Sequence, residues 1–486
     1  FMPGFGVSAS PANTPVFNPA KPSTFNNPAG WYDDIADGPV RAKVTVGDKD
    51  FDADPAWVAS APPNYAPDIV GWRNMNDLMQ NVYMSSGMLP LPTRVSFRKH
   101  VKPILTRLSE LQWVNKGFLS MFGAGAPMNF NDKNLLKKLA TAPVSMLYPD
   151  PNGELRRTIY NSFRAKDTKS VEEGAWPWIY GDAFGYTNPD PSVAPSADTY
   201  LQLPAFYDYV LSAWVKGDFI SDYNPEEDKH DTFNKVDLQE QPNTLDEANM
   251  HFCIADAFHP GAELTWPMRN ASMYRAPYRI RMRAAGKNDP TYGSKLTTED
   301  VAAMNGPLYD QGPGDLTRWM AVPWQGDTAF CRSGYDMEYD PYLPTFWPAR
   351  VPNQVLTRID YRTLMDSNNS YEERIAAFQN RPSWLRQLPG ANPVAEQMQY
   401  MIDHFGEMGI VEAMPSPNKD KGFKWMPDTL YVENLTPVKG AELDEAHKLF
   451  LENYGAMNDT DRALTEAGWF SEEQRNEFET IKRRGN

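Results

Sequence analysis

Proline is the residue that most constrains how this chain can fold, because it occurs 43 times in 486 residues. Each proline fixes its own φ angle, lacks a backbone N–H and restricts the residue before it, so prolines interrupt helices and central strands. This content favours many ordered loops over a helical bundle. Hydrophobic residues make up 41% of the chain and aromatic residues 13%, which is too apolar for disorder. We therefore expect a loop-rich globular protein.

Periodicity predicts helices and at least one strand, and so an α+β fold with a strand-containing N-terminal part. Residues 40–46 alternate apolar and polar, which predicts a half-buried strand. Apolar residues recur at helical spacing over 97–114. Thr244 is expected to cap a helix that carries Cys253. Further helices are expected over 132–141, 204–216, 370–380, 393–407, 441–454 and 471–484.

The expected domain organisation has three parts, although no repeat or Ser/Gly-rich linker divides the chain cleanly. Residues 1–30 are rich in Pro, Asn, Ser and Ala and are expected to form an extended arm. Residues 31–436 form the main domain, and the charged residues 437–486 form a covering helical subdomain. The chain begins with Phe1, without Met and without a basic or apolar leader, so we interpret it as a processed product or one piece of a longer precursor.

Charge and composition exclude several classes of function. The net charge is −16, which disfavours nucleic acid and anionic membrane surfaces as partners. No apolar run reaches the length of a membrane span. The six histidines are scattered without close Cys/His clusters, so no metal site is predicted. The alternating aspartates of residues 48–54 lack the Gly and closing Glu of an EF-hand, which favours a solvated turn over a calcium loop.

Residues 314–353 contain the strongest candidate for a functional segment. They combine three tryptophans, a cysteine, three arginines and several acids in a stretch without helical or strand periodicity. Loops with such residues often serve binding or catalysis. The alternative, an aromatic core beneath a loop, is favoured by composition alone.

Two parts of this segment resemble the bacterial L-lysine ε-oxidase and glycine oxidase family. They are Trp319-Met-Ala-Val-Pro-Trp-Gln-Gly-Asp-Thr-Ala-Phe-Cys-Arg-Ser-Gly-Tyr335 and Phe346-Trp-Pro-Ala-Arg-Val-Pro-Asn353. Two earlier stretches are similar to the family as well, namely Gly30-Trp-Tyr-Asp-Asp-Ile-Ala-Asp-Gly-Pro-Val-Arg-Ala42 and Pro63-Asn-Tyr-Ala-Pro67. The resemblance extends from about residue 30 to beyond residue 390.

The resemblance implies cysteine tryptophylquinone, a cofactor built from the protein's own side chains, with helices around a central quinone site. A cysteine sulfur is joined to an indole whose ring carries an ortho-quinone. The matching motif places the cysteine at Cys331 and an active-site carboxylate at Asp327, which would act as base. The alternative role for Asp327 is to cap a local turn. Trp384 is the preferred partner of Cys331, and Trp347 is the alternative.

Four further residues are tentative members of a substrate pocket. Cys253 resembles a second cysteine that lies near the substrate in the lysine oxidase, although a lone helical cysteine is usually a small buried hydrophobe. His259 leaves a glycine oxidase as an alternative, because the glycine oxidases have a histidine in place of the cysteine that Cys253 resembles, and His259 is close to Cys253 in the sequence. Arg350 and Arg332 are candidate clamps for a substrate carboxylate, since the guanidinium offers a two-pronged donor. A salt bridge or a bond to a loop is an equally good reading of each arginine.

The resemblance implies a secreted quinoprotein amino-acid oxidase. It would deaminate a free amino acid with O2 as electron acceptor and release ammonia and hydrogen peroxide, with the lysine ε-oxidase activity preferred. A glycine oxidase is the alternative, and a non-catalytic secreted binding or structural protein is the alternative of another class. The expected partners are a maturation flavoprotein, further copies of the chain and the rest of a processed precursor. The expected location is extracellular or periplasmic.

Overall fold

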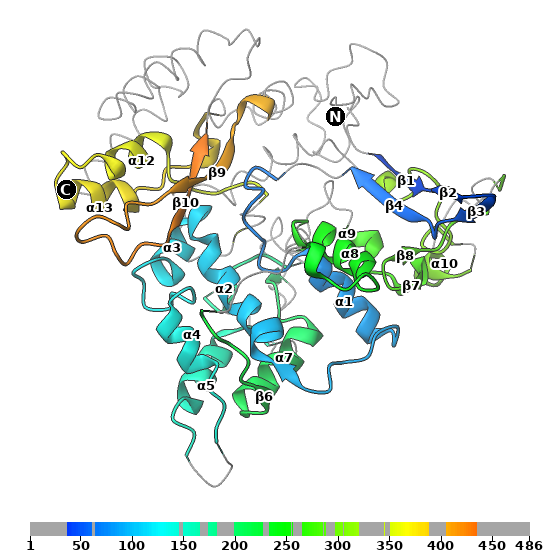
Figure 1. Ribbon diagram of the computed structural model, residues 1–486, viewed down its shortest axis with the longest axis horizontal. Coiled ribbons are helices and arrows are strands. Elements are labelled where there is room, and N and C mark those ends of the chain that lie inside the picture. The colour runs from blue at the N-terminus through cyan, green and yellow to red at the C-terminus, as the bar shows by residue number, and fades with distance from the viewer. Residues whose placement is uncertain are drawn as a thin grey trace, which may run out of the picture.

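The computed structural model describes fourteen stretches of the chain, in which helices and small sheets are mixed (Figure 1). The described residues are 36–60, 64–144, 149–165, 174–181, 199–226, 233–253, 255, 265–284, 286–287, 297–304, 306–319, 345, 350–387 and 405–434. This mixture confirms the predicted α+β class. None of the helices in these stretches is long and apolar enough to cross a membrane.

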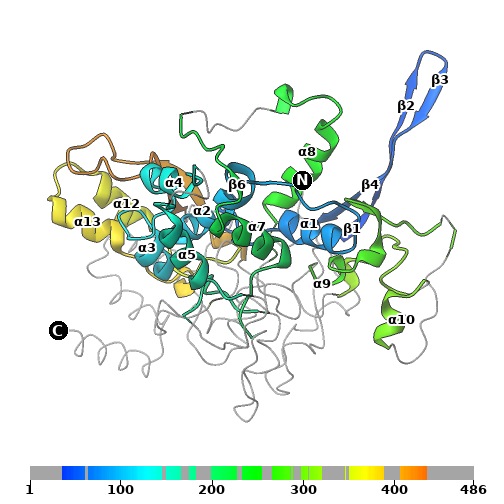
Figure 2. The same ribbon diagram turned by 90° about the horizontal axis from the view of Figure 1, so that it is seen from below.

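The N-terminal strands form a ribbon that projects from the body of the protein. Strand β1 (Ala36–Val40) pairs antiparallel with β4 (Ala56–Ser60), and β2 (Lys43–Val46) pairs with β3 (Lys49–Asp52). The β2–β3 end extends away from the rest of the chain (Figure 2). The predicted half-buried strand over 40–46 is therefore wrong, because it is interrupted between β1 and β2 and because every residue of β2 is exposed. Alternation of apolar and polar residues indicates that a strand has one apolar face, but it does not show what covers that face. Here β2 pairs with β3, whose residues are equally exposed.

The aspartates around this ribbon contact the protein's own polar and cationic side chains. The Asp50 carboxylate lies 2.7 Å from the ammonium of Lys43 and accepts a hydrogen bond from the Thr45 hydroxyl. Asp54 forms an ion pair with Arg275. In the described part of the chain, no group of three His, Cys, Asp or Glu side chains is placed to bind a metal ion. Asp50 and Asp54 thus form local ion pairs.

The larger hydrophobic core collects most helices of the first half of the chain. It buries Trp72, Trp214 and Trp384 completely. Three predicted helical stretches, over 97–114, 132–141 and 204–216, are confirmed. The helices are a π-helical turn (Phe97–Val101), α2 (Lys102–Glu110), a 3-10 turn (Leu111–Trp113), α3 (Lys116–Phe122), α4 (Lys133–Leu139), α5 (Gly153–Ser162) and α7 (Ala205–Val215). Strands β5 (Val95–Ser96) and β6 (Phe219–Ile220) pair in parallel beside them.

A smaller second core lies beneath the ribbon. Its elements are α1 (Met75–Ser85), α8 (Gln241–His251), α9 (Thr265–Met268), β7 (Tyr274–Ala276), β8 (Arg279–Ile280) and α10 (Thr298–Ala302). The helix that was expected to carry Cys253 exists as α8, but it ends at His251, two residues before Cys253, and Thr244 does not cap it. Pro242 occupies its first turn, a position that tolerates proline. Thr244 lies inside the helix, where its hydroxyl donates to the carbonyl of Glu240.

The C-terminal part of the described chain returns to the larger core. Its elements are α12 (Arg358–Met365), α13 (Tyr371–Gln379), a 3-10 turn (Trp384–Gln387) and the antiparallel strands β9 (Ile410–Pro415) and β10 (Thr429–Asn434). The helix predicted over 370–380 is confirmed as α13. The helices predicted over 441–454 and 471–484, and all but the last residues of 393–407, lie outside the described residues.

Candidate functional site

A cavity of about 560 Å³ lies between β4, α1, α8 and β8, over the smaller core. Its volume suits a small organic ligand. The apolar part of the wall includes Trp57, Met75, Met79, Met250, Met268 and Leu316. The side chains that bring polar or charged groups to it include Asn64, Asp246, Cys253, Thr265, Arg279 and Arg350. Ligand sites are typically apolar cavities in which a small number of polar groups fix the orientation of the ligand.

Three tyrosines form one side of this cavity. The rings of Tyr274 and Tyr278 stand edge-on to Tyr83, with centroid distances of 5.1 and 5.3 Å. The Tyr83 hydroxyl accepts a hydrogen bond from the backbone N–H of Tyr278, which has a positive φ of 56°. Burial raises the pKa of all three phenols, so they remain protonated at neutral pH. They therefore offer the cavity an aromatic, uncharged wall.

Cys253, one of the predicted pocket residues, lies on the cavity just after the end of α8. Its thiol donates a weak hydrogen bond to the carbonyl of Asn249, and its own carbonyl accepts one from the N–H of Met75. Burial raises the pKa of the thiol, so it stays neutral. The side chain thus shapes the cavity as a small, neutral group.

We expect Cys253→Ala to change the KM for substrate while the quinone absorbance stays unchanged, because the side chain lines the cavity. A cysteine that only fills core space would instead lower the free energy of unfolding by about 1–2 kcal/mol with unchanged kinetics. Measuring KM and melting temperature on one sample separates the two results. An unchanged KM with a lowered melting temperature would assign Cys253 to packing alone.

Arg350 reaches the same cavity from the segment that resembles the oxidase family. Its side chain is buried, and its backbone carbonyl accepts a 2.7 Å hydrogen bond from the N–H of Tyr65. The cavity thus brings together Cys253 and Arg350, two predicted pocket residues that are far apart in the sequence. A buried guanidinium at a cavity wall is suited to an anionic ligand group.

Trp384, the preferred quinone residue, lies directly behind Tyr65. The two ring centroids are 5.4 Å apart, and Trp384 is 0% exposed. Its backbone N–H donates to the carbonyl of Asn353, and Val355 donates to the carbonyl of Pro382. Residues 64–67 and 350–353, which are the described parts of two stretches with the family resemblance, therefore meet at this indole.

The surroundings of Trp384 fit a modified indole. Among the described residues, its ring N–H has no hydrogen-bond partner although it is completely buried. Such a group is costly unless something else satisfies it. Tyr65 covers the ring, and its chain neighbour Asn64 lines the cavity.

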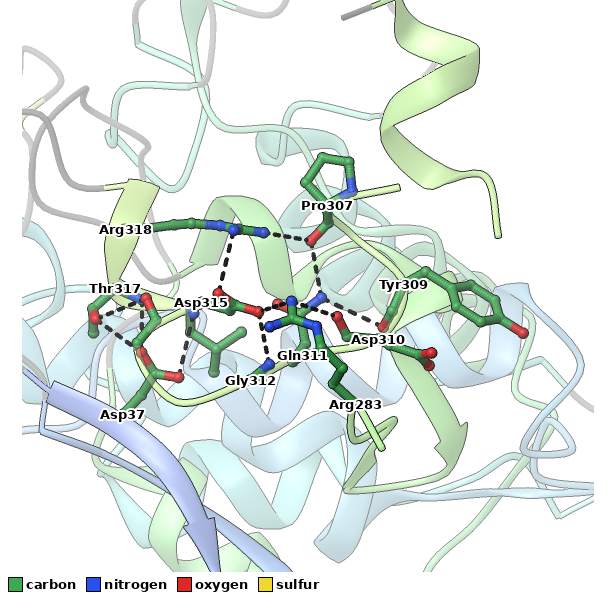
Figure 3. Close-up of polar contacts among 12 residues, drawn as sticks. Asp37, Arg283, Pro307, Tyr309, Asp310, Gln311, Gly312, Asp315, Thr317 and Arg318 are labelled. Carbon is green, nitrogen blue, oxygen red and sulfur yellow. Dashed lines mark hydrogen bonds and ion pairs between the residues drawn. The ribbon is translucent and has the colours of Figure 1, made fainter. Parts of the chain in front are cut away.

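Asp37 of β1 fixes the start of the functional segment (Figure 3). Its carboxylate accepts hydrogen bonds from the backbone N–H groups of Leu316 and Thr317 and from the Thr317 hydroxyl. It also accepts one from the indole N–H of Trp57, which lines the cavity. A buried carboxylate with several donors is well stabilised in its charged form. Asp37 thereby ties the N-terminal ribbon to the entry of the segment.

Asp315 holds the next part of the same network. It accepts a hydrogen bond from the backbone N–H of Gly312 and forms ion pairs with Arg283 and Arg318 (Figure 3). A Cβ at Gly312 would lie 2.5 Å from a guanidinium nitrogen of Arg283, so a larger residue there would displace this guanidinium. The chain therefore enters residues 320–344 from a rigid, charge-paired turn.

The remaining predicted site residues lie outside the described residues. These are Asp327, Cys331, Arg332, Trp347 and His259. Sequence reasoning missed the ion pair between Asp246 and Arg279, whose N···O distance is 2.8 Å. The two residues belong to α8 and β8, and only the tertiary fold brings them to one wall. No local sequence signal marks such a pair.

Comparisons with known proteins agree with the resemblance seen in the sequence. Residues 187–347 match the family described as "L-lysine epsilon oxidase C-terminal domain", and residues 1–60 match "L-Lysine epsilon oxidase N-terminal". An L-lysine 6-oxidase of Marinomonas mediterranea is 26% identical over 338 residues. That match covers 62% of this chain and 41% of the relative.

Solved structures share the fold. The ε-lysine oxidase from Marinomonas mediterranea matches with a TM-score of 0.53 and 18% identity, over 84% of this chain and 64% of that chain. The structure described as the Schiff base intermediate of the same bacterium's L-Lys ε-oxidase with L-Lys gives a TM-score of 0.52 and 19% identity, over 89% of this chain and 67% of that chain. The chain thus spans less than half of the curated relative's length and about two thirds of the solved chains.

Proposed function

We propose that this chain, which belongs to the L-lysine ε-oxidase family, forms the catalytic part of a quinoprotein that oxidatively deaminates a free amino acid with O2. The products would be ammonia and hydrogen peroxide. The observation that carries the proposal is the meeting of residues 64–67 and 350–353, the described parts of two family-like stretches, at the buried Trp384, while Asn64 and Arg350 of these stretches also line a cavity large enough for an amino acid.

The proposed cofactor is cysteine tryptophylquinone, formed from Cys331 and Trp384. When formed, such a quinone accepts two electrons from a primary amine and passes them to oxygen. Burial of Trp384 suits this role, because a reactive quinone must be shielded from water and stray nucleophiles. Trp347 is the alternative. The backbone bond from Trp384 to Asn353 would hold the indole in place.

The residues of the cavity would prepare the substrate. An amine that enters the part of the cavity lined by Met75 and Met250 leaves water, and desolvation lowers its pKa toward the neutral, nucleophilic form. Asp327 would then remove a proton from the carbon that bears the amine. The fixed aromatic wall limits the orientations of the substrate, which lowers the entropic part of the barrier.

The ε-amine of L-lysine is the preferred point of attack, and glycine is the alternative substrate. The cavity volume of about 560 Å³ is far larger than glycine needs. If the α-amine is oxidised instead, the substrate carboxylate must lie beside the quinone. Arg350 would then be its clamp, because its backbone is bonded to Tyr65, the residue that covers Trp384. Arg332 is the second candidate for that role.

A peptide map with mass spectrometry tests this proposal. We expect Cys331 to be joined to Trp384 by a thioether, with the indole carrying the extra oxygens of a quinone. Cys331 should then be missing from a thiol titration of the denatured chain, while Cys253, which is a free cysteine, provides the positive control. Quinone-dependent redox staining of the denatured chain should agree. Free Cys331 with unmodified Trp384 and Trp347 in active protein would refute the proposal, as would a Cys331–Cys253 disulfide.

The proposal extends to partners and location. Formation of the quinone would require a separate flavoprotein as maturation partner, and the chain would assemble into a homo-oligomer. We place the mature protein outside the cell or in the periplasm. Co-expression with and without a candidate flavoprotein, followed by fractionation and the same peptide map, tests maturation and location together.

A further inference from the structure

We infer that Asp246 and Arg279 bind the α-amino and α-carboxylate groups of the substrate, at the end of the cavity away from Trp384. This inference rests on the proposed oxidation of an amino acid and concerns only where its charged head is held. Both side chains line the cavity, and their N···O distance is 2.8 Å. No sequence pattern marks them.

The two charges lie at one end of the cavity. Asp246 is about two helical turns before Cys253, which corresponds to about 10 Å along α8. The Cys253 end is the end that faces Trp384, because Asn64 donates to the carbonyl of Phe252 and the adjacent Tyr65 covers the indole. The Asp246 end and the Trp384 end are therefore separated by more than one amino-acid backbone, so a single short substrate such as glycine cannot reach both.

The charge pattern of this pair matches that of an α-amino acid. Asp246 presents an anion for the α-ammonium, and Arg279 presents a cation for the α-carboxylate. The guanidinium of Arg279 also lies 3.5 Å from the carboxylate of Asp54 and donates to the carbonyl of Tyr278. These contacts fix its position while the ligand competes for Asp246. A pair of opposite charges binds a zwitterion without leaving net charge at the cavity.

The partial exposure of Asp246 and Arg279 suits the charged head of an amino acid. The side chains of Asp246 and Arg279 are 25% and 22% exposed, so the zwitterion keeps part of its hydration there. At the Cys253 end, Met75 and Met250 line the cavity and would strip water from whatever enters. Arg350 could pair there with a carboxylate, but Asp246 is the one acid among the described lining residues, so an α-ammonium at the Cys253 end would have no carboxylate partner, whereas an aliphatic chain with a neutral amine needs none. The substrate therefore enters with its side-chain amine first.

Thr265 provides an independent sign that the cavity holds a polar ligand. Its side chain is 5% exposed and lines the cavity, and its hydroxyl has no hydrogen-bond partner among the described residues. A buried hydroxyl in that condition is uncommon, because it costs free energy unless a ligand or water satisfies it. It offers a donor and an acceptor to the bound molecule.

Binding of L-norleucine to the mature protein tests this inference, since that ligand carries the α-amino acid head and an aliphatic chain without a side-chain amine. Calorimetric titration would compare it with hexanoate, which lacks the α-ammonium, and with L-norleucinamide, which lacks the carboxylate. We expect wild-type protein to bind L-norleucine about ten-fold or more tightly than either analogue. Asp246→Asn should abolish the preference over hexanoate, and Arg279→Gln should abolish the preference over L-norleucinamide.

Arg275→Gln is the matched control, because Arg275 belongs to the adjacent strand β7, pairs with Asp54 and is 43% exposed. It should keep both preferences. Preferences that survive in the Asp246 and Arg279 variants, equal loss in the Arg275 control, or no binding to wild type would overturn the inference. Peroxide release from L-norleucine would overturn it as well, because the head would then lie at the quinone. Failure of the proposed function is seen separately, as an unmodified Cys331 in the peptide map.

Discussion

Replacing Trp384 with phenylalanine should abolish both the quinone absorbance and turnover. Phenylalanine keeps an aromatic ring beside Tyr65, but it has no indole to receive a sulfur and two oxygens. Because Trp384 is completely buried, the exchange should also lower the free energy of unfolding by about 1–3 kcal/mol. The visible spectrum, peroxide release and thermal unfolding of one preparation measure the three effects.

Trp347→Phe is the paired control. We expect it to retain the absorbance and turnover, because the indole that would be modified is still present. The opposite pattern, with activity kept in Trp384→Phe and lost in Trp347→Phe, would transfer the quinone to Trp347. A folded Trp384→Phe protein that regains a free Cys331 thiol would further separate loss of the cross-link from loss of the fold.

The fold was predictable wherever a local pattern decides it. The leucines of residues 97–114 and the apolar face of residues 204–216 gave helices close to those observed. Helix α1 was missed, although Asn74 and Asp77 form a capping box at its start. Strands β9 and β10 were missed because their pairing depends on the partner strand more than on local periodicity. The half-buried strand over residues 40–46 failed because alternation alone does not show whether anything covers the apolar face.

Only part of the candidate site was predictable, because the rest depends on how distant elements pack together. The motif resemblance singled out Trp384, Arg350 and Cys253, and the structure places two of them on one cavity and the third behind Tyr65. The opposite wall was not predictable. Asp246 and Arg279 come from a helix and a strand whose association is set by packing of the smaller core. The chain has 63 acidic and 47 basic residues, and the sequence does not show which of them pair at the wall of a cavity.

The two ends of the cavity together give a physical basis for choosing the amine that reacts. A partly hydrated pair of opposite charges holds a zwitterion, and an apolar wall leads toward the indole. Selectivity between an ε-amine and an α-amine then depends on length, because the head and the reacting nitrogen must occupy both ends at once. A mobile substrate without a head group would lose this alignment and react more slowly.

Replacing Asp327 with asparagine should lower kcat by about 10²- to 10⁴-fold, the usual contribution of a positioned general base. The amide keeps the size of the carboxylate but cannot accept the proton from the carbon that bears the amine. The motif places Asp327 shortly before Cys331, and the segment that carries both leaves the rigid turn held by Asp37 and Asp315. Loss of a group used only in the transition state should lower kcat and kcat/KM together and leave substrate affinity unchanged.

The visible spectrum and a substrate isotope effect make this test specific. If Asp327 is the base, Asp327→Asn with an intact quinone should show a larger rate reduction for substrate deuterated at the reacting carbon than wild type does, because proton removal becomes fully rate-limiting. A loss of quinone absorbance would instead place Asp327 in cofactor formation. Asp336→Asn, in the same segment after Cys331, is the matched control and should keep the wild-type rate. A wild-type kcat in Asp327→Asn would leave Asp327 as a turn residue and move the search for the base to another carboxylate near Trp384.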